Sequence, residues 1–178
     1  MIIGLVGEKL AGKDTIANYL VEKYGADHFR FTHILDAILE ELGMPISRQN
    51  EIDLGLGLRK IFGEHVLVSA LEKRVKKSRA KMIAVNGIRM DEADIVKSWG
   101  AKIIYVTAPA DVRFGRYKNR HEKADDAQMN LEQFIRQEQG PTEIRIPELG
   151  RGADFRIDNI GSLDELYKKV DDIINKLK

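Results

Sequence analysis

A short stretch near the start of the sequence has the residue types and the spacing that bind phosphate. Residues 7–13 read GEKLAGK, in which four residues separate two glycines and a lysine follows the second. Glycines let backbone N–H groups approach phosphate oxygens, and the lysine adds a full positive charge. This segment, called the phosphate-binding loop below, predicts nucleotide contacts from Gly7, Glu8, Lys9, Leu10, Ala11, Gly12 and Lys13.

The residues on either side of this loop predict a strand before it and a helix after it. Residues 1–6 form an apolar run, and apolar residues recur at helical spacing after Lys13 until Gly25 ends the pattern. Strand, glycine loop and helix in this order distinguish a nucleotide site from an ordinary tight turn. One departure stands out: Asp14 follows the lysine where a magnesium-binding hydroxyl is usual, and Thr15 comes one position later.

The rest of the sequence alternates strand and helix patterns. Strands are predicted at 28–31, 81–87, 101–108 and 153–158, and helices at 33–42, 47–62, 64–77, 91–99, from 110, at 131–139 and from 162. Such alternation predicts an α/β fold with a doubly wound, five-stranded parallel sheet. We expect one domain over 1–178, because no linker, repeat or low-complexity segment interrupts the pattern.

Composition and charge exclude several classes of function. The 178 residues carry a net charge of +1, which argues against an extended nucleic-acid-binding surface. The absence of cysteine excludes disulfides and thiolate chemistry and fits the cytoplasm. No apolar run approaches the length of a membrane span, and the apolar start is too short for a signal peptide. We therefore expect a cytoplasmic protein with no membrane partner.

Ligands of parallel sheets bind at the carboxyl ends of the strands, so the residues there are candidates for the site. The strand at 81–87 ends in Asn86 and Gly87, followed two positions later by Arg89. Many phosphate-binding proteins have an acidic residue that helps to hold magnesium at this strand end, whereas an amide orients a metal-bound water without adding charge. Arg89 either binds a phosphate with two hydrogen bonds or forms a surface salt bridge.

A basic helix follows Pro109. Arg113, Arg116 and Arg120 are three and four residues apart and therefore share one helical face, and Arg136 lies in the next predicted helix. Two helices that carry arginines over the ligand edge of the sheet would make a lid over 110–140, which excludes water and brings positive charge to a transferred phosphate. The alternative is a solvated basic helix face.

The segments GEKLAGKDT, NGIR, DVRFGRYKNR and ADFRIDNIGSLDELYKKV together resemble the P-loop nucleoside monophosphate kinase group. The likeness extends over residues 1–175 and is to adenylate-kinase-like, dephospho-CoA-kinase-like and phage-type deoxynucleoside monophosphate kinases. It implies a P-loop NTPase fold with an inserted helical acceptor-binding region at 33–75 and a short helical lid. It also implies ATP and Mg²⁺ as cofactors and a small, nucleotide-like phosphate acceptor as the partner.

The resemblance also implies roles for single residues. Lys13, Arg116 and Arg120 would be catalytic, Asn159 and Gly161 would lie against the nucleotide base, and Asp36, Arg59 and Arg89 would bind the acceptor. In the phage-type kinases the hydroxyl also comes one position late, so Thr15 would bind the α-phosphate or a magnesium-bound water. Asp14 would either reach the water shell of the metal or stabilise the positive end of its helix.

Two positions depart from the family pattern. Asn86 stands where an aspartate is usual, and His33 stands where dephospho-CoA kinases have the base that activates a ribose hydroxyl; Asp36, one helical turn later, could replace that base. The sequence therefore predicts an ATP-dependent kinase for a (deoxy)nucleoside monophosphate. The alternatives are a dephospho-CoA kinase-like enzyme and a non-kinase NTP-binding regulator or assembly factor. The sequence indicates no oligomeric state.

Overall fold

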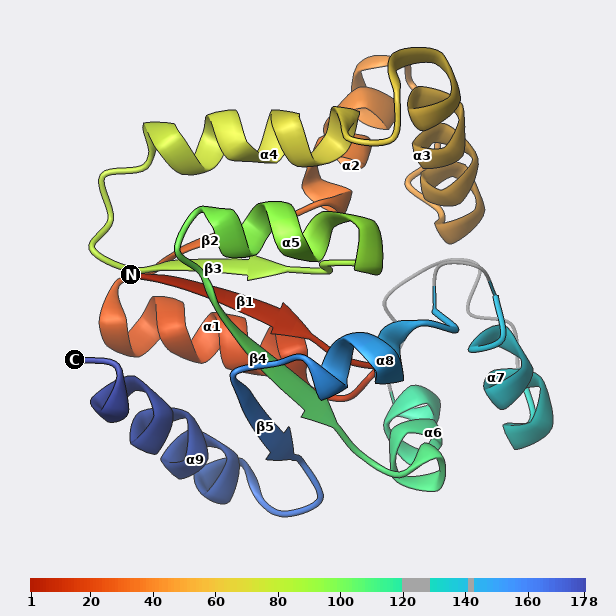
Figure 1. Ribbon diagram of the computed structural model, residues 1–178. Coiled ribbons are helices and arrows are strands. Elements are labelled where there is room, and N and C mark those ends of the chain that lie inside the picture. The colour runs from red at the N-terminus through yellow and green to blue at the C-terminus, as the bar shows by residue number, and fades with distance from the viewer. Residues whose placement is uncertain (120–128, 141–142) are drawn as a thin grey trace.

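The computed structural model describes residues 1–119, 129–140 and 143–178. Its strands form one parallel sheet in the order β2-β3-β1-β4-β5 (Figure 1). They are β1 (Ile2–Val6), β2 (Asp27–Arg30), β3 (Ile83–Asn86), β4 (Lys102–Thr107) and β5 (Phe155–Asp158). This confirms the predicted five-stranded parallel sheet.

The helices cover both faces of the sheet (Figure 1). Those of the described residues are α1 (Lys13–Tyr24), α2 (Thr32–Glu41), α3 (Arg48–Phe62), α4 (Val66–Lys77), α5 (Met90–Ser98), α6 (Ala110–Lys118), α7 (Leu131–Gln137), α8 (Ile146–Arg151) and α9 (Leu163–Lys176). None of these helices is long and apolar enough to cross a membrane.

Alternating strand residues divide the core into two layers. Ile104 and Val106 of β4 pack with α1 and α9, whereas Ile103 and Tyr105 pack with α2, α4, α5 and α8 on the opposite face. This alternation follows from the two-residue period of a strand. Both faces are apolar because helices cover both of them, as is usual for a parallel sheet.

Side-chain caps begin two helices where the sequence predicts them. The Ser47 side chain accepts a hydrogen bond from the Asn50 N–H and begins α3, and Ser162 and Glu165 form the predicted capping box of α9. Helix α8 is not predicted, because only two buried apolar residues in six leave no measurable period.

The sheet places all strand carboxyl ends at one edge. The phosphate-binding loop connects β1 to α1 there, and α3, α6 and α7 lie on the same side of the molecule (Figure 1). The predicted inserted region at 33–75 corresponds to α2, α3 and most of α4, and the described part of the predicted lid consists of α6 and α7. The fold therefore brings the candidate residues to a common edge.

Candidate functional site

The phosphate-binding loop has a backbone conformation that requires its two glycines. Gly7 has φ +152°, and a Cβ atom there would lie 1.9 Å from the carbonyl oxygen of Val106. Gly12 has φ +109°, and its Cβ would lie 2.3 Å from the Asn159 side-chain nitrogen. Neither position accepts a side chain without a shift of its surroundings. The loop is thus packed tightly between β4 and the segment after β5.

Lys13 lies at the first position of α1 and reaches back over the loop. Its Nζ donates hydrogen bonds of 2.8 Å and 2.7 Å to the carbonyl oxygens of Gly7 and Glu8. Desolvation, together with the positive charge of Arg89, lowers the pKa of Lys13 to about 8, although the charges of Asp14 and Glu143 oppose this shift. A phosphate placed beside this amine would favour its charged form.

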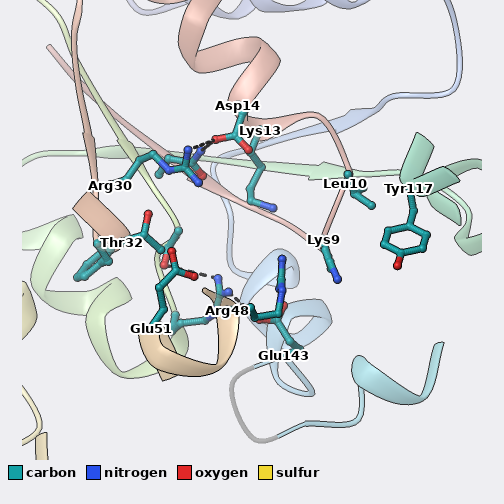
Figure 2. Close-up of a pocket in the computed structure, with 14 residues that line it drawn as sticks. Lys9, Leu10, Lys13, Asp14, Arg30, Thr32, Arg48, Glu51, Tyr117 and Glu143 are labelled. Carbon is teal, nitrogen blue, oxygen red and sulfur yellow. Dashed lines mark hydrogen bonds and ion pairs between the residues drawn. The ribbon is translucent and has the colours of Figure 1, made fainter. Parts of the chain in front are cut away.

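A cavity of about 200 Å³ adjoins the loop at the carboxyl edge of the sheet (Figure 2). Five of its lining residues are basic and three are acidic, so the balance of charge favours an anionic ligand. The lining consists of Lys9, Leu10, Lys13, Asp14, Arg30, Phe31, Thr32, Arg48, Glu51, Asn86, Gly87, Arg89, Tyr117 and Glu143. Residues from the starts of α1, α2 and α3 and from the end of β3 therefore face one space.

Asp14 of α1 contacts the last residues of two strands, β2 and β3, at this cavity. Its Oδ1 accepts a hydrogen bond of 2.8 Å from Asn86 Nδ2 and lies 3.4 Å from Arg30 Nη1. Asn86 is 3% exposed, and its Oδ1 has no hydrogen-bond partner within the described part of the chain. The predicted position of Asn86 beside the loop agrees with this geometry. The side chain of Thr15 is half-buried in the same first turn of α1.

These residues fit a magnesium ion that is held mainly by phosphate. The described residues contain no cluster of three or more His, Cys, Asp or Glu side chains that could hold a metal ion. Mg²⁺ keeps several waters and binds one or two protein groups together with substrate phosphates, so it does not need such a cluster. Thr15, Asp14 and the unsatisfied Asn86 oxygen would hold the ion or its waters.

Arg89 and two further arginines face the cavity. Arg89 forms an ion pair of 2.7 Å with Glu143, so both interpretations of this residue, ion pair and ligand contact, stay open. Arg30 and Arg48 are cavity residues that the sequence does not single out. Arg30 is the last residue of β2 and Arg48 the first of α3, and they reach the cavity through the packing of these elements, which no local sequence signal gives.

Two predicted acceptor residues do not line the cavity. Arg59 Nη2 instead lies 2.7 Å from Glu92 Oε1, and the second oxygen of this buried carboxylate accepts the backbone N–H of Arg89. Asp36 is half-buried on α2. The structure therefore brings Lys13, Asp14 and Arg89 together but leaves Arg59 and Asp36 outside the lining.

The arginines of α6 contact the phosphate-binding loop rather than the cavity. Arg113 and Arg116 donate to carbonyl oxygens of the loop, and Arg116 also donates to Asn159. Asn159 in turn donates to Ala11, while Gly161 is exposed in the same segment. Arg120 lies outside the described residues.

Comparison with known proteins finds related chains of similar length. A UPF0200 protein from Methanothermobacter thermautotrophicus is 27% identical and aligns with 99% of this chain and 90% of its own length. A UPF0200 protein from Methanoregula boonei is 24% identical over 99% of this chain and 97% of its own. No model of a known protein family matches the chain.

Solved kinase structures share the architecture. Shikimate kinase from Acinetobacter baumannii superposes with a TM-score of 0.61 at 22% identity, covering 99% of this chain and 94% of that one. The shikimate kinase from Bacteroides thetaiotaomicron gives a TM-score of 0.65 at 14% identity, covering 98% of each chain. The chain has a P-loop NTPase fold. At these sequence identities the likeness establishes the fold, and the activity has to be inferred from the residues of the site.

Proposed function

We propose that the protein is an ATP-dependent kinase that transfers the γ-phosphate to a small anionic acceptor, specifically a (deoxy)nucleoside monophosphate. One observation carries the proposal: a single cavity joins Lys13 of the phosphate-binding loop to three arginines from other parts of the fold, Arg30 of β2, Arg48 of α3 and Arg89 just before α5. The loop accounts for the donor phosphates. The arginines provide a second anion-binding region in the same small cavity. Donor and acceptor phosphates bound there would lie close together, as phosphate transfer requires.

Different residues would bind the donor and the acceptor phosphates. Backbone N–H groups of the loop and the Lys13 ammonium bind the β- and γ-phosphates of ATP, and Arg89, with Arg30 or Arg48, binds the acceptor phosphate. Magnesium, when bound, supplies charge neutralisation at the transferred group. An acceptor phosphate is already an anionic nucleophile, so alignment and charge neutralisation suffice without a strong base.

The position of Asp36 distinguishes this proposal from a kinase for hydroxyl groups. A neutral hydroxyl acceptor, as in dephospho-CoA or in the shikimate bound by one structural neighbour, needs a base within hydrogen-bond reach. Asp36, the predicted replacement base, does not line the cavity. The cavity carboxylates Asp14, Glu51 and Glu143 each have interactions within the protein. The predicted base thus lies outside the cavity lining, which favours an acceptor such as a monophosphate whose nucleophilic oxygen is already anionic.

A coupled assay of ADP release tests the proposal with a panel of ribo- and deoxyribonucleoside monophosphates, dephospho-CoA and shikimate. We expect release to rise with one class of monophosphate. If only dephospho-CoA or shikimate increased ADP release, the acceptor would be a hydroxyl compound instead of a monophosphate. ADP release that no acceptor increases would favour an NTP-binding regulator.

The Arg89→Ala variant extends the test to the acceptor site. Loss of a hydrogen bond between charged groups should raise the KM for the acceptor roughly ten- to a hundredfold and leave the KM for ATP nearly unchanged. Arg151→Ala, on the exposed side of α8, is the matched control. A change in the KM for ATP alone would mean that Arg89 belongs to the donor site.

A further inference from the structure

Three consecutive carbonyl groups of the phosphate-binding loop accept hydrogen bonds from one helix. Arg113 Nη1 donates to the Lys9 oxygen at 3.3 Å, and Arg116 Nη1 donates to the oxygens of Leu10 and Ala11 at 3.1 Å and 3.3 Å. Both arginines lie on α6, which follows β4 and is far from the loop in the sequence. Helix α6 therefore contacts the backbone of the middle of the loop, from Lys9 to Ala11.

Arg116 also connects the loop to a third segment. Its Nη2 donates to the carbonyl oxygen of Asn159 at 2.6 Å, and Asn159 Nδ2 donates to the Ala11 oxygen at 2.8 Å. A closed set of hydrogen bonds thus joins α6, the loop and the segment between β5 and α9. Asn159 is 7% exposed, so water competes little for these bonds.

Arg113 is itself fixed in place. Its Nε donates to the Ala108 oxygen at 2.8 Å, and its guanidinium forms an ion pair with Glu138 just after α7. The residue is 5% exposed. Arg113 therefore holds the Lys9 carbonyl from a buried position and cannot turn into the cavity without losing the contacts with Ala108 and Glu138.

The held carbonyl groups determine the direction of the loop N–H groups. In a planar trans peptide the N–H of each residue points opposite to the preceding carbonyl, so carbonyls held outward turn the Leu10 and Gly12 N–H groups toward the other side of the loop. The Ala11 N–H closes a turn onto the Glu8 oxygen at 3.2 Å, and Leu10 within that turn has φ +62°. A leucine disfavours this left-handed conformation, so the turn needs outside support to persist.

We propose that Arg116, supported by Arg113, is a positioning residue that holds the phosphate-binding loop in its phosphate-receiving shape before the nucleotide arrives. Arg116 is not among the residues that line the cavity, and its bonds go to three backbone oxygens. This assigns Arg116 a role through the loop, in place of the direct charge neutralisation that the family resemblance implies. The inference depends on the proposed function only in taking nucleotide phosphates as the ligand.

Amide hydrogen exchange of the nucleotide-free protein tests the inference directly. Arg116→Ala should speed exchange in peptides that cover residues 7–13 and leave exchange in α9 unchanged. The Kd values for ATP and ADP should rise by the same factor, roughly tenfold, while the Kd for adenosine stays constant. Arg151→Ala serves as the control and should behave like the wild type.

The same measurements can overturn the inference. Unchanged exchange at 7–13 together with a loss of kcat alone would assign Arg116 to the transferred phosphate instead. Should Arg116→Ala fail to fold, Arg116→Lys replaces it: one ammonium cannot span three carbonyls, so faster exchange than in the wild type at 7–13 supports the inference and wild-type exchange contradicts it. If the wild type binds no nucleotide, the proposed function fails, whereas the exchange data still decide whether Arg116 orders the loop.

Discussion

At the scale of single residues, Lys13 combines a structural and an electrostatic role. Its amine donates to two loop carbonyls, and desolvation together with the charge of Arg89 lowers its pKa to about 8. Phosphate oxygens would restore the charged form because an anion beside the amine stabilises the proton. The energy of nucleotide binding is therefore linked to the protonation of one side chain.

We predict that the affinity for ATP falls as the pH rises above 8. Nucleotide binding raises the pKa of Lys13, so binding takes up a proton once the free protein has lost it, and affinity falls up to tenfold per pH unit. Fluorescence titration with ATP between pH 7.5 and pH 10 measures the slope. Lys13→Met should bind weakly at every pH, and a persistent slope in that variant would assign the titration to another group.

The same pKa shift predicts the stability of the Lys13→Met variant. An unfolded lysine keeps a pKa near 10.5, so between pH 8 and pH 10.5 the unfolded chain binds more protons and wild-type stability rises with pH. Lys13→Met lacks this rise, so the stability of the wild type relative to the variant should increase by roughly 1–3 kcal/mol between pH 7 and pH 10. Urea denaturation at pH 7 and pH 10 compares the two proteins.

At the scale of elements, Glu92 joins α3 to the start of α5. The carboxylate is 3% exposed and accepts hydrogen bonds from Arg59 at 2.7 Å and from the Arg89 backbone N–H at 2.8 Å. A buried carboxylate is costly unless it is paired, so the two contacts depend on each other. Arg59 thereby supports the segment that carries Arg89 without lining the cavity itself.

We predict that Arg59→Ala destabilises the protein more than it affects acceptor binding. Loss of the charged partner of Glu92 should lower the free energy of unfolding by roughly 2–3 kcal/mol, measured by urea denaturation. The second change Glu92→Gln should recover part of this loss because it removes the buried charge. Unchanged stability with a raised acceptor KM would instead support the role that the family resemblance implies.

The contact between β3 and α1 predicts a magnesium-dependent stability. Asn86→Asp would place a second carboxylate against Asp14, where the amide now donates at 2.8 Å. Two carboxylates at this distance repel each other unless a cation or a proton separates them. Thermal melts should show a lower Tm than the wild type in chelator and a larger increase on addition of Mg²⁺. The neutral Asn86→Ala variant is the control, and an equal magnesium response in all three proteins would place the ion elsewhere.

At the scale of the whole molecule, the fold follows from sequence patterns but the cavity does not. The run at 1–6, the GEKLAGK loop and the capping box at Ser162 are local signals, so the sheet and its loop are predictable. Arg30 and Arg48 join the site only through the packing of β2 and α3. Arg59 is of a residue type that often binds phosphate, yet long-range packing pairs it with Glu92.

The cavity also balances its own charges across distant segments. Arg89 after β3 pairs with Glu143, which precedes α8, and Arg30 of β2 lies beside Asp14 of α1. A ligand anion must therefore compete with carboxylates that the protein already holds at the site. This competition sets a threshold for binding and favours ligands with more than one negative charge.

We predict that Glu143→Gln strengthens the binding of polyphosphate anions. The change removes one of the three cavity carboxylates and leaves all five basic residues, so Arg89 exchanges a charged partner for a neutral one. A partly exposed pair of this kind contributes about 1 kcal/mol, which corresponds to roughly fivefold in affinity. Calorimetric titration with inorganic tripolyphosphate should show this gain at low ionic strength and less of it at high salt. Glu148→Gln, an exposed carboxylate on α8 outside the cavity, is the matched control. Weaker binding in Glu143→Gln would show that the carboxylate orients Arg89 toward the ligand rather than competing with it.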